Sequence, residues 1–587
     1  MAKNLRPGED KNSKAPPLGA EIATANKLGA PLDHKGVAAE SSHATSAVLD
    51  SAHVGDIQGA FGTIREHDLA ARRSWWKKVI TLLAIVGPGL IVMVGDNDAG
   101  GVATYAQAGQ KYGLSLLWTL PLLIPVLIVN QEMVVRLGAV TGVGHARLIR
   151  ERFGKFWAAF SVGDLFVLNF LTITTEFIGV SLALGYFGIS AYISVPIAAV
   201  GLIAITATGS FRIWERFMFV FVVVNFLAIP LVILVHPHVG PIVHGFLVPG
   251  AQGGMTSTAV LLIIAIVGTT VAPWQLFFQQ SNIVDKRITP RWINYERTDT
   301  ILGSFIIVTA AAALVITAAF AFRGTKLAGQ FTNARDVAVG LEHYVGHGTG
   351  PIFALVLLNA SIIGAAAVTL STSYAFGDIF GIRHSLHRKL ADAKQFYLIF
   401  SSLVIVSAGI VLIPRAPLGL ITTAVQALAG VLLPSATVFL LLLCNDKQVL
   451  GPWVNRTWLN VLAGFIVAVL VALSLILMVT TVLPNLNVNT LALVLGALIV
   501  AGFLVIAVWE LSPGQLAKRR GAARLAEAER PETAVRRETW RMPQLALLER
   551  PVWSRGRTAA MWTLSVYLGV AVLLLIIKAV QLGTGGH

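Results

Sequence analysis

Long stretches of apolar residues recur along the whole chain and restrict what it can fold into. Of its 587 residues, 55% are hydrophobic and 13% are charged, whereas a soluble domain carries roughly a quarter charged residues. A helix needs about 20 apolar residues to cross the hydrocarbon layer of a membrane. Stretches of suitable length occur at thirteen places: 79–109, 113–138, 156–187, 190–208, 214–236, 257–283, 299–323, 350–381, 395–413, 418–444, 456–483, 489–511 and 561–582. The sequence therefore predicts an all-α polytopic membrane protein embedded in a lipid bilayer.

The positive charges are distributed unevenly over the predicted loops. The formal net charge is +15, but the basic residues fall in tails and short loops between apolar stretches, so we expect no nucleic-acid partner. Every second loop is rich in basic residues, such as Arg147, Arg150 and Arg152 before the third span. Cytoplasmic loops carry such an excess. We therefore expect a multi-pass protein of a cell membrane, a bacterial inner membrane, with its N-terminus in the cytoplasm.

Changes in composition divide the chain into five predicted parts. They are a disordered cytoplasmic tail (1–74), a transport core (75–450), two accessory transmembrane helices (451–511), a basic cytoplasmic connector (512–558) and a further transmembrane helix (559–587). The chain has one cysteine, Cys444, so a disulfide within it is impossible. We expect a monomer that is not an enzyme and has no cofactor.

The first span contains a cluster of acids and glycines deep in its apolar stretch. Asp96 and Asp98 stand directly before Gly100 and Gly101. A charged residue at the centre of a membrane costs roughly 2.5–3.5 kcal/mol on insertion scales. Non-helical backbone survives at that depth only where it is buried in protein or lines a watery cavity. The pattern predicts a broken helix, although Asp98 could merely cap its second half.

The sixth span contains Pro273, which has no backbone N–H and disrupts a helix. The break would leave carbonyl oxygens of Gly268, Thr269 and Thr270 without their usual donors. Spans one and six occupy matching positions of two five-helix repeats, about 79–236 and 257–445. A proline alone often gives only a kink, but paired interruptions in matching positions are typical of a transporter's substrate site.

Several short motifs resemble the Nramp family of divalent-metal transporters. That family opens its first helix with Gly-Pro-Gly, breaks it at Asp-Pro-Gly-Asn, and continues to Gln-Ala-Gly and Leu-Leu-Trp. The corresponding residues here are Gly87-Pro88-Gly89, Asp98-Ala99-Gly100-Gly101, Gln107-Ala108-Gly109 and Leu116-Leu117-Trp118. The resemblance covers about 80–455 and implies a LeuT-like fold, with two inverted five-helix repeats, extra C-terminal transmembrane helices and alternating access.

The departures from the family pattern bear on the ion. The family's Asn becomes Gly101, its Met-Pro-His becomes Ala272-Pro273-Trp274, and a later His becomes Gln279. An acid three residues before Glu176 becomes Ile173. These losses resemble the Nramp-related magnesium transporters. The small Gly101 and Ala272 would leave room for an ion that keeps part of its water shell, as Mg²⁺ usually does.

The candidate ligands at the two breaks all present oxygen. Asp98 is the expected anionic ligand, and Asp96 is a second acid or a charge on the entry path. Thr269 and Thr270 would contribute carbonyl or hydroxyl oxygens, and Gln426 an amide oxygen through water. Such hard ligands suit Mg²⁺, Ca²⁺ or Mn²⁺ rather than softer ions.

Three functions follow from these features. The first is uncoupled uptake of Mg²⁺ by alternating access, with Mn²⁺ as a second substrate, because the histidines of proton-coupled relatives are missing. The second is a proton-coupled Mn²⁺ or Fe²⁺ importer of the same fold. The third, of another class, is an Nramp-like membrane receptor that does not transport and signals through 512–558.

Overall fold

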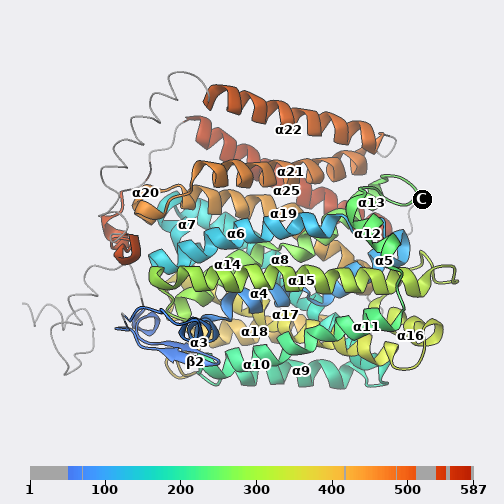
Figure 1. Cartoon of the computed structure of the whole chain (residues 1–587), viewed down its shortest axis with the longest axis horizontal. Coiled ribbons are helices and arrows are strands. Elements are labelled where there is room, and N and C mark those ends of the chain that lie inside the picture. Colours follow the sequence, from blue (N-terminus) through green and yellow to red (C-terminus); the bar gives the residue numbers. More distant parts are fainter. Residues whose placement is uncertain are drawn as a thin grey trace, which may run out of the picture. The chain divides into compact units, whose positions relative to one another are not determined.

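The computed structural model of the chain describes residues 50–68, 70–414, 418–483, 486–510, 537–549, 551 and 555–583. The expected disordered tail up to residue 49 and the first half of the basic connector, 512–536, lie outside the described residues. The described part is almost entirely helical, and its long helices run close to parallel in Figure 1.

The first repeat begins with two bent segments followed by longer helices. Its members are α3 (Trp75–Ile85), α4 (Pro88–Asp96), α5 (Ala99–Tyr112), α6 (Thr119–Thr141), α8 (Lys155–Tyr186), α9 (Ala191–Thr206), α10 (Phe211–Val224), η2 (Asn225–Leu227) and α11 (Ala228–Leu234). Two short helices, α7 (His145–Phe153) and α12 (Val239–Leu247), connect them or follow them.

The second repeat and the C-terminal region continue the same pattern. The repeat consists of α13 (Ser257–Thr270), α14 (Pro273–Asp285), η3 (Pro290–Trp292), α15 (Ile293–Phe322), α16 (Ala334–Tyr344), α17 (Thr349–Phe380), α18 (Lys394–Val411) and α19 (Leu418–Cys444). After it come α20 (Lys447–Leu450), η4 (Gly451–Trp453), α21 (Thr457–Val482), α22 (Val488–Glu510), η5 (Leu545–Leu547) and α25 (Arg555–Gly583).

Each of the thirteen predicted spans contains a helix, but fewer qualify as membrane spans by length and composition. Within the described residues ten helices do so, or eleven when α3 and α4, bent by 54°, count as one span. The apolar helix α9 and the apolar segment Met561–Leu574 within α25 fall below the required length. The bend between α3 and α4, at Gly87 with φ of 153°, was not predicted.

Both predicted helix breaks are present. In the first span α4 ends at Asp96 and α5 begins at Ala99, because the Asp98 side chain caps the new helix. In the sixth span α13 ends at Thr270 and α14 begins at Pro273. Proline is favoured at the first position of a helix, where its missing N–H costs nothing. Local chemistry therefore produces each break.

Small residues let the helices around these breaks approach closely. A Cβ on Gly268 of α13 would lie 2.2 Å from the Gln426 carbonyl oxygen of α19. A Cβ on Gly109 of α5 would lie 2.2 Å from the Val315 carbonyl oxygen of α15. Figure 1 shows α15 running past α4 and α5, in agreement with their extensive contacts. Close backbone approach replaces the hydrophobic effect as the source of helix association in lipid.

The prediction of disorder for 1–74 is wrong for its last part. Residues 50–64 contain η1 (Ser51–His53) and an antiparallel pair of strands, β1 (Ile57–Gly59) and β2 (Gly62–Ile64), with Ile57 opposite Ile64. Ile57, Ala60 and Ile64 are each at most 4% exposed. These apolar side chains are few in a segment that is otherwise polar, so its composition did not predict a folded element. Their burial depends on packing against α3 and α10.

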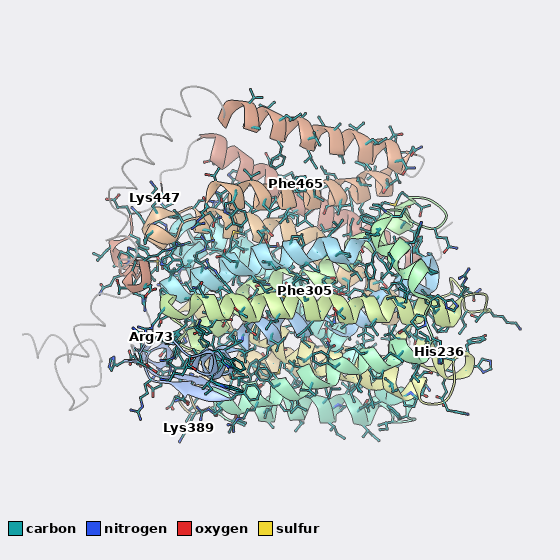
Figure 2. The ribbon with its side chains drawn as sticks, in the orientation of Figure 1. Arg73, His236, Phe305, Lys389, Lys447 and Phe465 are labelled. Carbon is teal, nitrogen blue, oxygen red and sulfur yellow. The ribbon has the colours of Figure 1, made fainter. Side chains whose placement is uncertain are left out.

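Loops that the charge pattern predicts to lie on opposite sides of the membrane lie at opposite ends of the helix bundle. In Figure 2 the labelled Arg73, Lys389 and Lys447 lie toward one end, and His236 lies toward the other. Residues 50–64 lie at the end with the basic loops, which the sequence predicts to be cytoplasmic.

Candidate metal-binding site

Asp98 lies at the first break and is buried, with 2% of its surface exposed. Its Oδ1 accepts a hydrogen bond of 2.6 Å from the Gly101 amide, which fixes the carboxylate at the N-terminus of α5. Exposed N–H groups and the helix dipole make such an end favourable for negative charge. The sequence predicted either a capping or a ligand role for Asp98, and the geometry shows that it caps α5.

Two side chains from distant helices converge on the same carboxylate. The Thr269 hydroxyl, at the end of α13, donates to Oδ1 of Asp98 over 3.4 Å. The Gln426 amide of α19 donates over 3.3 Å to Oδ1 and over 3.4 Å to Oδ2. The carbonyl oxygen of Thr269 lies four residues before Pro273, which has no N–H to offer it. Donor groups of three helices, the Gly101 amide of α5, the Thr269 hydroxyl of α13 and the Gln426 amide of α19, thus surround one buried carboxylate.

A second acid closes the other side of the first break. Glu176 of α8 accepts a hydrogen bond of 3.1 Å from the amide of Ala99, the residue after Asp98. Its other oxygen, Oε1, is buried and has no hydrogen-bond partner among the described residues. Gly364 of α17 makes room for this pair, since a Cβ there would lie 2.7 Å from Glu176 Oε2 and 3.0 Å from the Asp98 Cβ.

The other predicted ligands occupy different positions around the break. Both carboxylate oxygens of Asp96 are buried and lack hydrogen-bond partners in the described part of the chain. The Thr270 hydroxyl lies 2.8 Å from the Tyr105 hydroxyl and donates to the Ile266 carbonyl oxygen. Ala272 is buried at the start of α14, and its carbonyl oxygen accepts from Gln275. The structure therefore groups Asp98, Gly101, Thr269 and Gln426, but not Asp96, Thr270 or Ala272, by direct contact.

Some contacts at the site were not predicted from the sequence. Tyr105 holds the Thr270 hydroxyl, and Gly100 and Gly364 provide space for neighbouring side chains. A Cβ on Gly100 would lie 1.6 Å from Gln426 Nε2. The repeated glycines of the first span were the available signal for close approach, but the residues that they approach most closely lie in the distant helices α13, α15 and α19.

The positions of the family histidines have other roles here. Gln279 donates to the Thr300 hydroxyl over 2.9 Å. Trp274 is almost fully buried beside Phe278, with ring centroids 5.9 Å apart. Among the described residues no group of three or more His, Cys, Asp or Glu side chains is arranged to hold a metal ion. A cation at Asp98 would therefore also be held by carbonyl, amide, hydroxyl or water oxygens.

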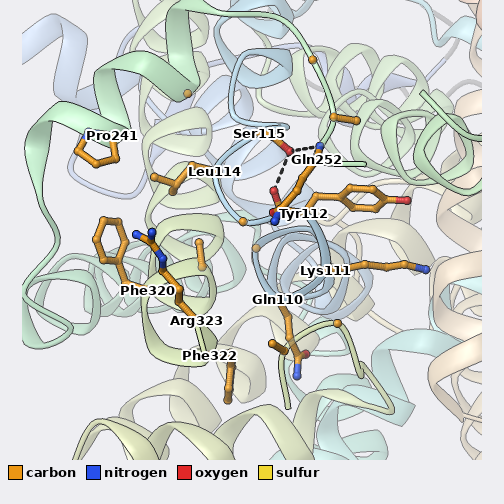
Figure 3. A pocket seen from close by; sticks show the side chains of 18 of the residues that line it. Gln110, Lys111, Tyr112, Leu114, Ser115, Pro241, Gln252, Phe320, Phe322 and Arg323 are labelled. Atoms are coloured by element: carbon orange, nitrogen blue, oxygen red, sulfur yellow. Dashed lines mark hydrogen bonds between the residues drawn. The ribbon is translucent and has the colours of Figure 1, made fainter. Parts of the chain in front are cut away.

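The site is closed toward the end of the bundle that we predict to be extracellular. A pocket of about 870 Å³ opens there between the end of α5, α12 and the end of α15 (Figure 3). Lys111, His244 and Arg323 are among its lining residues. Its inner limit is Gly109, where α5 and α15 are in backbone contact. The pocket therefore ends about three helical turns short of Asp98, at roughly 1.5 Å per residue of α5.

Two broken helices at matching positions of two five-helix repeats define a LeuT-like transporter fold. The fold is similar to the crystal structure of the Eremococcus coleocola manganese transporter in complex with an aromatic bis-isothiourea substituted compound. That similarity has a TM-score of 0.56 at 20% sequence identity and covers 75% of this chain and 96% of that chain. A structure of a variant of the same transporter has the same TM-score and covers 80% of this chain and 97% of that one.

The chain belongs to the Nramp family, described as natural resistance-associated macrophage protein-like, whose pattern matches residues 89–480. It is 27% identical over 419 residues to the divalent metal cation transporter MntH of Levilactobacillus brevis, covering 68% of this chain and 90% of that protein. It is also 27% identical over 417 residues to MntH of Bacillus subtilis, covering 68% and 93%. The resemblance to the family is confirmed, whereas the assignment to a magnesium branch stays a hypothesis.

Proposed function

We propose that this protein carries a divalent metal cation across the membrane through the site at Asp98. The observation that carries the proposal is the convergence of Thr269 and Gln426 on a buried carboxylate at a helix break. A buried carboxylate is costly unless it is paired or binds a cation. The relatives named divalent metal cation transporters, at 27% identity over most of their length, support the same conclusion.

The proposed ligands are Asp98, the Thr269 carbonyl oxygen and the Gln426 side chain. Gln426 presents its Nε2 to Asp98 in this structure, and rotation of the amide would present the oxygen to an ion instead. Asp96 is a further acid, which we place on the path of the ion through the membrane. The room expected at Gly101 is taken up by the Thr269 hydroxyl, from which a Cβ on Gly101 would lie 2.8 Å. Ala272 is buried at the second break, and Thr270 supports that break through Tyr105.

Manganese is the substrate that the comparisons favour. The structural relative is named a manganese transporter, and Mn²⁺ accepts the hard oxygen ligands present here. The expectation that Mg²⁺ is the main substrate has less support. We keep Mg²⁺ as the second candidate because Ala272 replaces the family's methionine, so the only sulfur ligand expected at the break is missing.

The alternative of a manganese importer also includes coupling of metal transport to protons. Asp98 and Glu176 are adjacent buried acids, joined through the Ala99 amide. Two carboxylates this close disfavour simultaneous ionisation. Binding of a cation would favour the ionised form of both, so release of a proton from this pair is a direct consequence of loading the site. We therefore propose that the entering cation displaces a proton from Asp98 or Glu176 and that this proton leaves toward the side on which the cation is released.

The test is uptake into proteoliposomes that contain a pH reporter. Mn²⁺, Mg²⁺ and Ca²⁺ are supplied separately to the wild type and to Asp98→Ala. We expect Mn²⁺ uptake with acidification of the lumen, and no uptake by Asp98→Ala. Mg²⁺ uptake without acidification would instead establish the uncoupled magnesium reading. Absence of uptake of any of the three ions would favour the receptor alternative.

A further inference from the structure

We propose that residues 50–64, hereafter the N-terminal hairpin, are a latch that holds the predicted cytoplasmic end of the transporter closed. The inference rests on the proposed function, because only a transporter has to open this end to release its cation. For Asp98 to reach solution there, the elements that cover it must separate. The hairpin binds several of those elements at once.

The hairpin packs directly on α3, the segment that leads into the first break. A Cβ on Gly59 would lie 2.0 Å from the Ala84 carbonyl oxygen, and one on Gly62 would lie 3.0 Å from the Ala84 Cβ. On its other side Arg216 of α10 donates to the Ala60 carbonyl oxygen over 2.9 Å, and Phe61 packs against Phe219. The hairpin therefore joins α3 to α10.

The hairpin also completes a buried ion pair beneath it. Lys286, directly after α14, lies 2.6 Å from Glu215 of α10, and both side chains are at most 1% exposed. Lys286 Nζ also donates to the carbonyl oxygens of Ile85 and Val86, at the bend between α3 and α4. The Ala60 amide donates to the second oxygen of Glu215. One buried cluster thus links α3, α10, α14 and the hairpin.

The strained backbone of Arg287 is independent evidence that the hairpin is held in place. Its φ of 67° lies in the left-handed region, where the end of a helix normally has glycine. The side chain explains the exception: Nε donates to the Ala52 carbonyl oxygen over 2.9 Å, and Nη1 donates to that of Asp56 over 3.1 Å. Gly55 leaves room for the guanidinium, since a Cβ there would lie 3.1 Å from Nη1. Strain of this kind persists where a contact requires it.

The loop after α17 forms the last attachment. Arg388 makes an ion pair with Asp50 through both Nε and Nη2. His53 contacts the same region, with Nε2 3.2 Å from the His384 carbonyl oxygen and 3.7 Å from Asp285 Oδ1. The hairpin therefore contacts elements of both repeats: α3 and α10 of the first, and the residues after α14 and the loop after α17 of the second. Its own apolar anchors are few, which suits a contact that must release.

The test measures access to a buried reporter from the hairpin side. Cys444 is replaced by alanine, and Ser304→Cys is introduced, because Ser304 is fully buried on α15 and faces Met93 of α4. Labelling by a membrane-impermeant maleimide then reports separation of α4 from α15. Gly59→Ala, which forces a Cβ against α3, and Arg287→Gly, which removes the side chain and relaxes its backbone, each release the hairpin.

Matched controls exist for both variants. Gly163→Ala adds a methyl group where nothing lies within 4 Å, and Arg383→Ala removes an exposed arginine from the loop that carries Arg388. We expect the release variants to label at least about fivefold faster than the controls, a typical coupling between linked states. Hydrogen–deuterium exchange at residues 57–64 verifies that the hairpin has been released.

The outcomes separate the latch from the proposed function. Unchanged labelling in a variant whose hairpin exchanges freely would overturn the latch and leave a passive cover. If Gly59→Ala fails to fold, Arg287→Gly and Arg388→Ala decide the same question. Wild-type vesicles without divalent-cation uptake would refute the proposed function, whereas the labelling comparison needs no transport to be scored.

Discussion

Gln426 Nε2 lies 3.3 Å from Oδ1 of Asp98, although 328 positions separate the two residues in the chain. The contact joins α19 to the first residue before α5. It is possible because Gly100 has no side chain, so the amide occupies space that a Cβ would fill. The helix break, Gly100 and Gln426 therefore form one structural unit.

Asp98→Asn should abolish uptake of divalent cations by proteoliposomes. The substitution keeps the shape and an oxygen that can cap α5, but it removes the negative charge that binds the cation. Asp392→Asn, in an exposed loop, is the matched loss of charge and should transport as the wild type does. Uptake by Asp98→Asn at the wild-type rate would remove Asp98 from the site.

Gly100→Ala should weaken cation affinity as much as Gln426→Ala does. The new Cβ would displace the Gln426 amide, whose loss as a supporting ligand we expect to cost about 10–100-fold in apparent affinity. The concentration dependence of uptake gives this value. Gly201→Ala, where nothing lies within 4 Å, provides the control. A large effect of Gln426→Ala with none for Gly100→Ala would show that the close approach is not required.

Ala272→Met should shift selectivity toward softer ions. Ala272 is buried at the second break, and a thioether there would add a sulfur ligand to a site otherwise made of oxygen. We expect Cd²⁺ to compete with Mn²⁺ more strongly in the variant, whereas competition by Mg²⁺ should decrease. Ala272→Leu controls for added volume. Equal gains for leucine and methionine would attribute the change to size alone.

Glu215→Gln should lower the free energy of unfolding by about 3–5 kcal/mol, because it leaves the Lys286 charge buried without its partner. Glu151→Gln, which breaks a partly exposed pair with Arg147, should cost at most about 1 kcal/mol. Unfolding in detergent, followed by tryptophan fluorescence, measures both. The double variant Glu215→Gln with Lys286→Met should recover part of the loss, and no recovery would argue against the ion pair as the cause.

Acidification at the hairpin side should release the N-terminal hairpin. Burial lowers the pKa of His53 below its usual 6.5, against the opposing effects of Asp285, Asp50 and Asp378 and with the help of His384. The docked hairpin therefore binds fewer protons at His53 than the released one. Docking is at full strength above about pH 6.5 and weakens as the pH falls through that value. The labelling of Ser304→Cys relative to that of Ser304→Cys with His53→Gln at the same pH should rise from about pH 7.5 to about pH 5.5. This ratio cancels the slower reaction of every thiol with maleimide at low pH, which follows from the loss of thiolate.

The two helix breaks could be predicted because each depends on residues next to it. A carboxylate before Ala99 caps a new helix, and Pro273 cannot continue an old one. The apolar stretches likewise predicted helices, although α9 and Met561–Leu574 fall short of a full span. Fold and family followed from such local features together with the motifs of the first span.

The hairpin could not be predicted in the same way. Its apolar residues, such as Ile57 and Ile64, are separated by polar ones, and their burial depends on surfaces of α3 and α10. The positive φ of Arg287 is likewise intelligible only once Ala52 and Asp56 are in place to accept its hydrogen bonds.

The sequence by itself determined that the chain crosses a membrane as helices and that two of them break near Asp98 and Pro273, since apolarity, capping and a missing N–H act over a few residues. Only the tertiary structure decided that Gln426 contacts Asp98, that Thr270 contacts Tyr105 and that residues 50–64 cover one end. Those contacts join positions far apart in the chain, and their geometry depends on how closely whole helices approach one another.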